Sequence, residues 1–268
     1  MEREKETAIV AARAAGAIIR AVYETKYAVS YKSSDSPVTI ADRDANQKIH
    51  EMLQGAFPEY GWLSEETADS PARLSSQRVW VVDPMDGTKE FIEKIPEFAV
   101  SIGLIEAGIP VLGVVYNPIL DQLFWAVRDQ GAWCADRRLH VSQTARLADA
   151  LILSSRSETK RGEWKDFTSL LQTRPMGSIA YKLASIANGE ADASFTLVPK
   201  NEWDICAGTL LVEEAEGMVT SLTGKPVIFN QPQTLLPGLV ASNGKLHAQL
   251  LELVAPRLTQ RHLTDARQ

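Results

Sequence analysis

Two aspartates three residues apart, Asp83 and Asp86, stand where an apolar run of the chain ends. The preceding residues 80–82 are typical of a buried strand, and Pro84 and Gly87 indicate a turn after it. Two carboxylates held together at the end of a buried strand repel each other and lose hydration. A divalent cation is the simplest compensation, and a site built only of oxygen atoms favours magnesium. The segment alone is equally consistent with two ordinary turns, Asp-Pro and Asp-Gly.

Gly87 and Thr88 follow the second aspartate, and the residues from Lys89 onward favour a helix. The first backbone N–H groups of a helix have no partner within it, and they lie at the positive end of the helix dipole. Such a position suits a phosphate group. The segment therefore predicts a cation site and a phosphate site next to each other.

Three further acids have types and positions that suit the same chemistry. Glu65 lies in a Ser-Glu-Glu segment, Asp204 opens an apolar helical run, and Asp42 follows Thr39 at the start of another helix. Each acid also has an ordinary explanation by itself. Paired acids are usually solvated, and an Asp or Thr at a helix start usually caps the helix. Either Thr39 or Asp42 fits that capping role.

The first half of the chain predicts two helices followed by a series of short strands. Apolar residues at three- and four-residue intervals indicate helices over residues 4–23 and 42–57, with a loop at residues 33–37 between them. Short β-type runs follow at residues 79–82, 98–105, 110–116, 122–127 and 131–135. Their short connections favour an antiparallel meander, because parallel pairing needs a long crossover.

The second half predicts strands that alternate with helices, which is typical of an α/β arrangement with a mixed sheet. The expected strands are residues 151–155, 193–197, 218–221 and 239–242, and the expected helices are residues 160–172, 179–188, 204–216 and 246–254. The polar residues 257–268 are expected to fray. We therefore divide the chain into an α+β subdomain, residues 1–146, and an α/β subdomain, residues 147–268.

Composition narrows the function classes. The net charge is −6 at pH 7, so the chain lacks the basic character that binds nucleic acid polymers. No stretch reaches the roughly 18 apolar residues of a membrane span, and the N-terminal region lacks the apolar core of a secretory signal. Cys134 and Cys206 form no CxxC pair, so we expect free thiols and a reducing cytoplasm.

Taken together, these segments resemble the inositol monophosphatase superfamily. The segments that carry the resemblance are residues 36–42, 64–66, 83–88, 177–178 and 203–204, in the order and approximate spacing of that superfamily. The resemblance implies a cation-dependent phosphatase with Mg²⁺ as cofactor. Its partner would be a small phosphorylated substrate, either a nucleotide bisphosphate or a sugar or inositol phosphate. It also implies a layered αβαβα sandwich, and a homodimer is one expectation because family members are frequently dimers.

The resemblance also assigns roles to individual residues. The metal ligands that it implies are the main-chain carbonyl of Met85 and the carboxylates of Glu65, Asp83, Asp86 and Asp204. The substrate-binding residues that it implies are Gly87, Thr88, Ser178, Lys182 and Asp204, with the Gly87 and Thr88 amides on the transferred phosphate. Thr88, with its hydroxyl oriented by Asp42, would help Glu65 to activate the attacking water. These last three are the expected catalytic residues. All the ligands except Asp204 fall in residues 1–146.

Residues near the motifs bear on the substrate. Residues 89–91 and Lys182 resemble the 3'(2'),5'-bisphosphate nucleotidase branch, in which Lys182 would meet a second phosphate. Inositol monophosphatases typically carry a glutamate seven residues before the last metal aspartate, where this chain has Leu197. Ile179 and Ala180 depart from serines seen in some nucleotidases, and a surface lysine on a helix would also explain Lys182. We expect hydrolysis of the 3'-phosphate of 3'-phosphoadenosine 5'-phosphate. The alternative is an inositol-1-monophosphatase or another sugar-phosphate phosphatase.

Two interpretations from other classes fit less well. A haloacid-dehalogenase-type phosphatase places its two aspartates two residues apart, whereas Asp83 and Asp86 are three apart, so an aspartyl-phosphate intermediate is disfavoured. A noncatalytic metal-binding relative is the other alternative, but every expected ligand position is present. Lithium sensitivity is a further expectation that follows from the resemblance alone.

Overall fold

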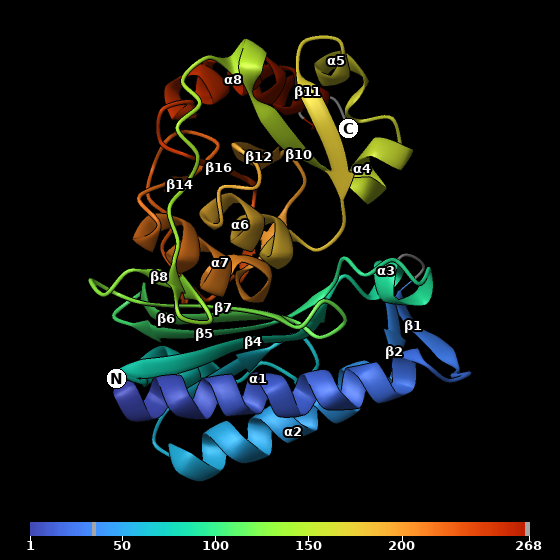
Figure 1. Ribbon diagram of the computed structural model, residues 1–268, viewed down its shortest axis with the longest axis vertical. Helices are drawn as coiled ribbons and strands as arrows, with labels where there is room; N and C mark the ends of the chain where they lie inside the picture. The colour runs from blue at the N-terminus through green and yellow to red at the C-terminus, as the bar shows by residue number, and fades with distance from the viewer. Residues whose placement is uncertain (34–35, 266–268) are drawn as a thin grey trace.

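Helices and strands alternate in five layers (Figure 1). Helices α1 (Glu2–Tyr23) and α2 (Ile40–Ala56) form one outer layer and pack on a seven-stranded sheet. Helices α6 (Ile179–Ala187) and α7 (Glu202–Glu214) lie between this sheet and a five-stranded sheet, and α8 (His247–Asp265) covers the far face of the latter. The arrangement confirms the α+β fold and the αβαβα layering that the resemblance implied.

The computed structural model describes residues 1–33 and 36–265 of the chain. Within these ranges no helix has the length and apolar character that a membrane crossing demands. Apolar packing is continuous between the two halves, since one buried cluster contains Leu63 together with Leu153 and Leu210. The boundary between the proposed subdomains therefore crosses no break in the core, and its position stays a prediction.

The seven-stranded sheet contains the predicted meander. Its strands, in spatial order, are β3 (Gly61–Ser64), β4 (Arg78–Asp86), β5 (Ala99–Glu106), β6 (Ile109–Asn117), β7 (Gln122–Val127), β8 (Ala132–Cys134) and β9 (Arg137–Arg138). Neighbours from β4 to β9 pair antiparallel, and β3 joins parallel to β4. Tight turns make the connections short: Ala107 and Gly108, between β5 and β6, both adopt positive φ angles.

The five-stranded sheet is mixed, as predicted. Its strands, in spatial order, are β11 (Gln172–Met176), β10 (Leu151–Ser155), β12 (Ala193–Thr196), β16 (Leu239–Ser242) and β14 (Met218–Ser221). Strand β10 pairs parallel with β11 and β12, whereas β16 pairs antiparallel with β12 and β14. Phe195 and Val240 of this sheet are buried in one apolar cluster with Leu250 of α8, which holds the outer layer in place.

Several short elements surround the two sheets. They are β1 (Val29–Ser33), β2 (Ser36–Thr39), α3 (Thr88–Ile92), α4 (Arg156–Lys160), α5 (Lys165–Thr168), β13 (Lys200–Asn201), β15 (Leu235–Leu236) and the 3₁₀ helices Pro71–Ser75 and Leu147–Asp149. Strand β1 pairs with β2, and β13 pairs with β15, both antiparallel. Strand β13 directly precedes α7, so this pairing fixes the chain where α7 begins.

The expected helix over residues 160–172 is wrong. Ser155 caps α4 by accepting a hydrogen bond from the Glu158 amide at 3.3 Å, so the helix begins earlier. Gly162 then adopts a φ of +82°, which ends α4, and the short α5 follows. The chain next forms β11, an edge strand, and an edge position tolerates Pro175.

Two smaller differences concern the expected loop and the C-terminal end. The loop expected at residues 33–37 is part of the β1–β2 hairpin, with residues 34–35 outside the described residues. Helix α8 continues to Asp265, well past the expected end at Val254, so fraying from residue 257 is wrong for the described part. Residues 266–268 lie outside the described residues.

Candidate active site

A bulge at the end of β4 brings its two aspartates to the same face. Asp83 pairs with Ser101 of β5 and Asp86 pairs with Ala99, so three steps on β4 match two steps on β5. In a regular strand, residues three apart point to opposite faces, and one extra residue in a bulge restores a common direction. The spacing of three between the aspartates is therefore what a bulged strand needs to present both acids together.

Three carboxylates from three elements meet at this strand end. Oxygen atoms of Glu65, Asp83 and Asp204 lie within 4.8 Å of one another. The Glu65 amide donates to the carbonyl of Val82 at 3.2 Å, which fixes the residue after β3 beside β4. Asp204 lies in the first turn of α7, where its Oδ2 accepts from the Asn201 amide at 2.9 Å. That bond shows that Asp204 also helps to cap its helix, as its position in the sequence suggested.

The cluster is electrostatically unfavourable without a cation. Burial, followed by repulsion from the neighbouring carboxylates, raises the pKa of Asp83 well above its ordinary value, and the pKa of Asp204 is raised in the same way. A divalent cation would remove this repulsion. The donors are all oxygen atoms, which is the set that magnesium prefers, so Glu65, Asp83 and Asp204 fit the cation that the sequence predicted.

Asp86 contacts a different element. Its Oδ2 accepts hydrogen bonds from the Ser178 hydroxyl at 2.6 Å and from the Ala180 amide at 2.7 Å, both at the start of α6. Burial raises the pKa of Asp86, and these two hydrogen bonds oppose the shift. The contact joins β4 to the middle helical layer. Ser178, expected to bind substrate, thus holds Asp86 and also caps α6 by accepting from the Tyr181 amide at 3.0 Å. Metal ligation by Asp86 stays a prediction.

Thr88 and Asp42 are in direct contact. The Thr88 hydroxyl lies 2.9 Å from Asp42 Oδ1, and the Met85 carbonyl is a more distant acceptor at 3.3 Å. Asp42 Oδ2 accepts from both the amide and the hydroxyl of Thr39, each at 2.7 Å. Thr39 is the N-cap of α2 and Asp42 completes a capping box, so both residues share the capping role. Burial raises the pKa of Asp42 to about 6, despite these hydrogen bonds.

The backbone between Asp86 and Thr88 is tightly constrained. Gly87 adopts a φ of +101°, and a Cβ at this position would lie 3.0 Å from the Glu97 carbonyl oxygen. Only glycine suits both conditions. Gly87 and Thr88 line the same cavity as the carboxylates, so the proposed phosphate-binding amides lie next to the proposed cation site.

Lys182 is buried, so its interpretation as a surface lysine is wrong. Its side chain is only 4% exposed, lines the cavity, and donates to the Met176 carbonyl at a long 3.5 Å. Burial, and then repulsion from Lys200, lowers its pKa to about 8. Nearby Gly177 allows close packing, because a Cβ there would come within 2.2 Å of the Glu90 side chain.

One cavity of about 330 Å³ contains most of these groups. Its lining contains the carboxylates together with the basic side chains of Lys89, Arg161, Lys182 and Lys200. Sequence reasoning missed Lys200, Arg161 and the buried acid Glu158, none of which stands in a motif. Glu90, a second buried acid of this cavity, lies in the segment 89–91 that resembles the nucleotidase branch, but the sequence assigned it no role of its own. Asp42, in contrast, lies behind Thr88 and reaches the cavity only through it.

Leu197 does not face this cavity. Its side chain packs against the apolar cluster of the five-stranded sheet and lines a separate, small cavity beside Trp164 and Phe195. The position where inositol monophosphatases typically carry a glutamate thus contributes no polar group to the site.

Comparison with known proteins gives one consistent result. Residues 1–259 match the inositol monophosphatase family. The chain is 37% identical over 241 residues to the inositol-1-monophosphatase of Mesorhizobium japonicum, covering 87% of this chain and 88% of the relative. It is 38% identical over 228 residues to the Nus factor SuhB of Escherichia coli, covering 81% and 84%.

A solved structure agrees with this assignment. The IMPase of Thermotoga maritima superposes with a TM-score of 0.85 at 28% identity, covering 97% of this chain and 99% of that chain. The agreement therefore extends over nearly the whole length of both chains. This chain belongs to the inositol monophosphatase family, and the activity of that family is that of a phosphatase.

Proposed function

We propose that the protein is a magnesium-dependent phosphomonoesterase that removes the 3'-phosphate of 3'-phosphoadenosine 5'-phosphate. The observation that carries the proposal is the pairing, in one cavity, of the carboxylate cluster with the buried Lys182. The acids serve a cation and the reacting phosphate. The lysine serves a second anionic group on the same substrate.

Glu65, Asp83 and Asp204 would hold magnesium, with Asp86 and the Met85 carbonyl as the further ligands expected from the family. When bound, the cation would neutralise phosphate charge and lower the pKa of a coordinated water. The protein's own part is to fix these oxygens before substrate arrives. The capping bond fixes a carboxylate oxygen of Asp204, and the bond from the Glu65 amide to β4 fixes the Glu65 main chain beside the cluster.

Thr88 and Glu65 would position the attacking water. A hydroxyl has one proton to donate, and in Thr88 the shorter contact directs it to Asp42, which leaves the Thr88 lone pairs to accept from a water. Glu65 would take a proton from that water as the water oxygen bonds to phosphorus. The ester bond on the opposite side then breaks, and the departing alcohol takes up a proton. The Gly87 and Thr88 amides would hold the phosphate in line for this displacement.

The buried lysine supports a substrate with two phosphates. A buried ammonium group loses hydration, and the one hydrogen bond described for Lys182 is long. A second phosphate would supply the missing partner and would orient the reacting phosphate through a remote contact. An inositol monophosphate has no such second group. The apolar side chain of Leu197 adds to this preference, because it cannot accept hydrogen bonds from inositol hydroxyls as a glutamate would.

Inositol 1-phosphate is the second candidate substrate. It is favoured by the curated relatives, which include a protein named inositol-1-monophosphatase at 37% identity. The reaction at phosphorus would be the same for both substrates, since the carboxylates, Thr88 and the backbone amides do not depend on the departing alcohol.

A phosphate-release panel with magnesium tests the choice between them. The panel contains 3'-phosphoadenosine 5'-phosphate, inositol 1-phosphate and fructose 1,6-bisphosphate. We expect the highest kcat/KM on the nucleotide, with adenosine 5'-phosphate as product. Lys182→Ala should weaken that activity by roughly ten- to a hundredfold, and should affect inositol 1-phosphate much less. A wild type that prefers inositol 1-phosphate would assign the protein to the second candidate. Equal losses on both substrates would make Lys182 structural.

A further inference from the structure

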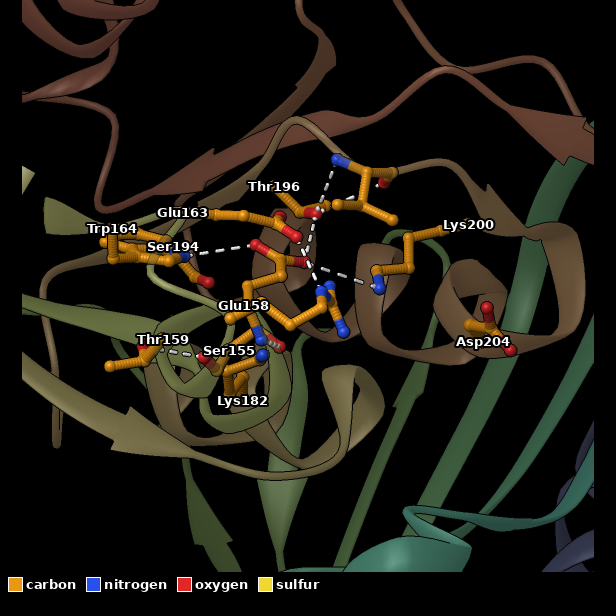
Figure 2. A network of polar contacts seen from close by, with 12 residues as sticks. Ser155, Glu158, Thr159, Glu163, Trp164, Lys182, Ser194, Thr196, Lys200 and Asp204 are labelled. Atoms are coloured by element: carbon orange, nitrogen blue, oxygen red, sulfur yellow. Dashed lines mark hydrogen bonds and ion pairs between the residues drawn. The ribbon is translucent and has the colours of Figure 1, made fainter. Parts of the chain in front are cut away.

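A buried glutamate outside the metal cluster organises one wall of the cavity (Figure 2). Glu158, on α4, is only 3% exposed. Its Oε1 accepts from the Thr196 hydroxyl at 2.7 Å, and its Oε2 accepts from the Trp164 indole N–H at 3.1 Å. Two neutral donors from different elements therefore fix the orientation of this carboxylate. They do not neutralise its charge, and a buried charge needs a counterion.

Lys200 supplies the positive charge that balances Glu158. Its Nζ lies 3.6 Å from Glu158 Oε1, and Figure 2 shows the lysine side chain directed toward the carboxylate. The Lys200 backbone is also fixed, because β13 pairs with β15 through Lys200 and Leu236. Lys200 stands four residues before Asp204, so the same short segment carries a cation and a proposed metal ligand. The lysine is held at both its backbone and its ammonium group.

Lys200 and Lys182 face the same cavity from different elements. Repulsion between them is strong enough to lower the pKa of Lys182, second only to burial. Two fixed ammonium groups beside one cavity are costly unless an anion lies between them or near both. Glu158 balances one of the two positive charges, and Asp86 and Glu90 also act on Lys182, so the positive charge that remains suits an anionic group placed near both lysines.

We propose that Lys200, positioned by Glu158, is a specificity-determining residue that binds the distal phosphate of the substrate together with Lys182. The inference rests on the proposed function, since it takes a substrate with a second phosphate. It adds the second cation of the subsite and the residue that orients it. Glu158 is a positioning residue, because its carboxylate acts on the ligand through Lys200.

A competing explanation is that Lys200 only balances the metal-site carboxylates. The charge of Lys200 opposes the raised pKa values of both Asp86 and Asp204, so the lysine is near enough to do so. In that case a substitution of Lys200 would affect magnesium binding and would change activity on all phosphomonoesters by the same factor. The two explanations therefore differ in what they predict for a pair of substrates that differ only in the distal phosphate.

The pair is 3'-phosphoadenosine 5'-phosphate and adenosine 3'-phosphate, which share the reacting phosphate and its leaving alcohol. We expect Lys200→Gln to lower kcat/KM for the bisphosphate by roughly ten- to a hundredfold, mainly through KM. The ratio of kcat/KM for the bisphosphate to kcat/KM for adenosine 3'-phosphate should fall accordingly. Lys200→Arg should restore most of the ratio. Glu158→Gln, which keeps the shape and one acceptor, should lower the ratio in the same direction by a smaller factor. Lys225→Gln, at an exposed position, is the matched control.

Equal losses on both substrates would overturn the inference, and so would a changed magnesium requirement with an unchanged ratio. Thermal unfolding of each variant shows whether the fold is intact. Calorimetric binding of adenosine 5'-phosphate, the product that retains the distal phosphate, separates this inference from the proposed function. If the wild type does not prefer the bisphosphate, the proposed substrate is wrong. If Lys200→Gln then binds adenosine 5'-phosphate more weakly than the wild type does, the result would still support the subsite. If both proteins bind it equally well, or if neither binds it detectably, the result would refute the subsite.

Discussion

The Thr88 hydroxyl donates to Asp42 Oδ1 across 2.9 Å, which connects the start of α3 to the first turn of α2. The other Asp42 oxygen is held by the amide and hydroxyl of Thr39. The acid that orients Thr88 is therefore fixed by the helix cap itself. We therefore expect Asp42, although it lies behind the cavity wall, to affect the reaction through Thr88.

Thr88→Val keeps the side-chain shape and removes the hydroxyl. We expect kcat to fall by roughly 10²–10⁴-fold with a smaller change in KM, because an orienting group acts mainly in the transition state. Asp42→Asn should also be slow, and the double variant should be little worse than the poorer single variant. Steady-state kinetics of the four proteins measure this coupling. Losses that multiply would show that the two residues act independently.

Asp86→Asn should abolish turnover and leave the fold intact. The asparagine oxygen can still accept from the Ser178 hydroxyl and the Ala180 amide, so the link to α6 should survive. Removing a negative charge from the cluster should leave the metal-free melting temperature unchanged or raise it. Thermal unfolding without metal and phosphate release with magnesium measure the two effects. Near-native turnover would refute a role for Asp86 at the cation.

The carboxylate cluster should make stability depend on pH in a characteristic direction. The pKa values of Asp83 and Asp204 are raised in the folded protein. At pH values above the ordinary pKa of these groups, the folded state therefore binds more protons than the unfolded state. Stability of the metal-free protein should therefore fall as pH rises through the window between the ordinary and the raised pKa values. The stabilisation by magnesium should grow over the same window, since protons compete with the cation.

Melting temperatures with chelator and with magnesium, measured from about pH 5 to about pH 8, test this linkage. Asp204→Asn provides the control, because it removes one charge of the cluster and keeps an oxygen for the Asn201 amide. The variant should show a weaker pH dependence and less stabilisation by magnesium. A wild type and variant with identical pH profiles would contradict the raised pKa of Asp204.

Calcium should compete with magnesium and support little turnover. Both cations accept oxygen ligands, but calcium takes more of them in a looser geometry, which would misplace the reacting groups. Initial rates at fixed magnesium and rising calcium measure the competition. Equal rates with either cation would argue against a site whose geometry matters. Lithium inhibition, expected from the family, can be measured in the same assay.

The fold and the acidic part of the site could be predicted largely from the sequence. Alternating apolar runs and short turns indicate the meander, and the pair Asp83 and Asp86 indicates a cation. The bulge that turns both aspartates to one face was not predicted, although their odd spacing is its sequence signal. Residues 160–172 were predicted incorrectly because the cap at Ser155 and the positive φ of Gly162 override the helical pattern.

The basic part of the site could not be predicted in the same way. Lys200 and Glu158 are 42 positions apart, and only the tertiary fold brings them together. The burial of Lys182 likewise depends on the middle layer, where α6 is covered on both sides by sheets. Single lysines and glutamates outside motifs carry no local pattern that distinguishes a buried partner from a solvated side chain.

Phosphate release from 3'-phosphoadenosine 5'-phosphate, followed with magnesium, with chelator, and after magnesium is restored, tests the central claim most directly. The claim is that Glu65, Asp83 and Asp204 hold a cation with which the protein hydrolyses a phosphomonoester. We expect release only when magnesium is present, full recovery on its return, and a loss of at least about 10³-fold in Asp83→Asn with magnesium. Release that continues in chelator, or near-native release by Asp83→Asn, would contradict the account.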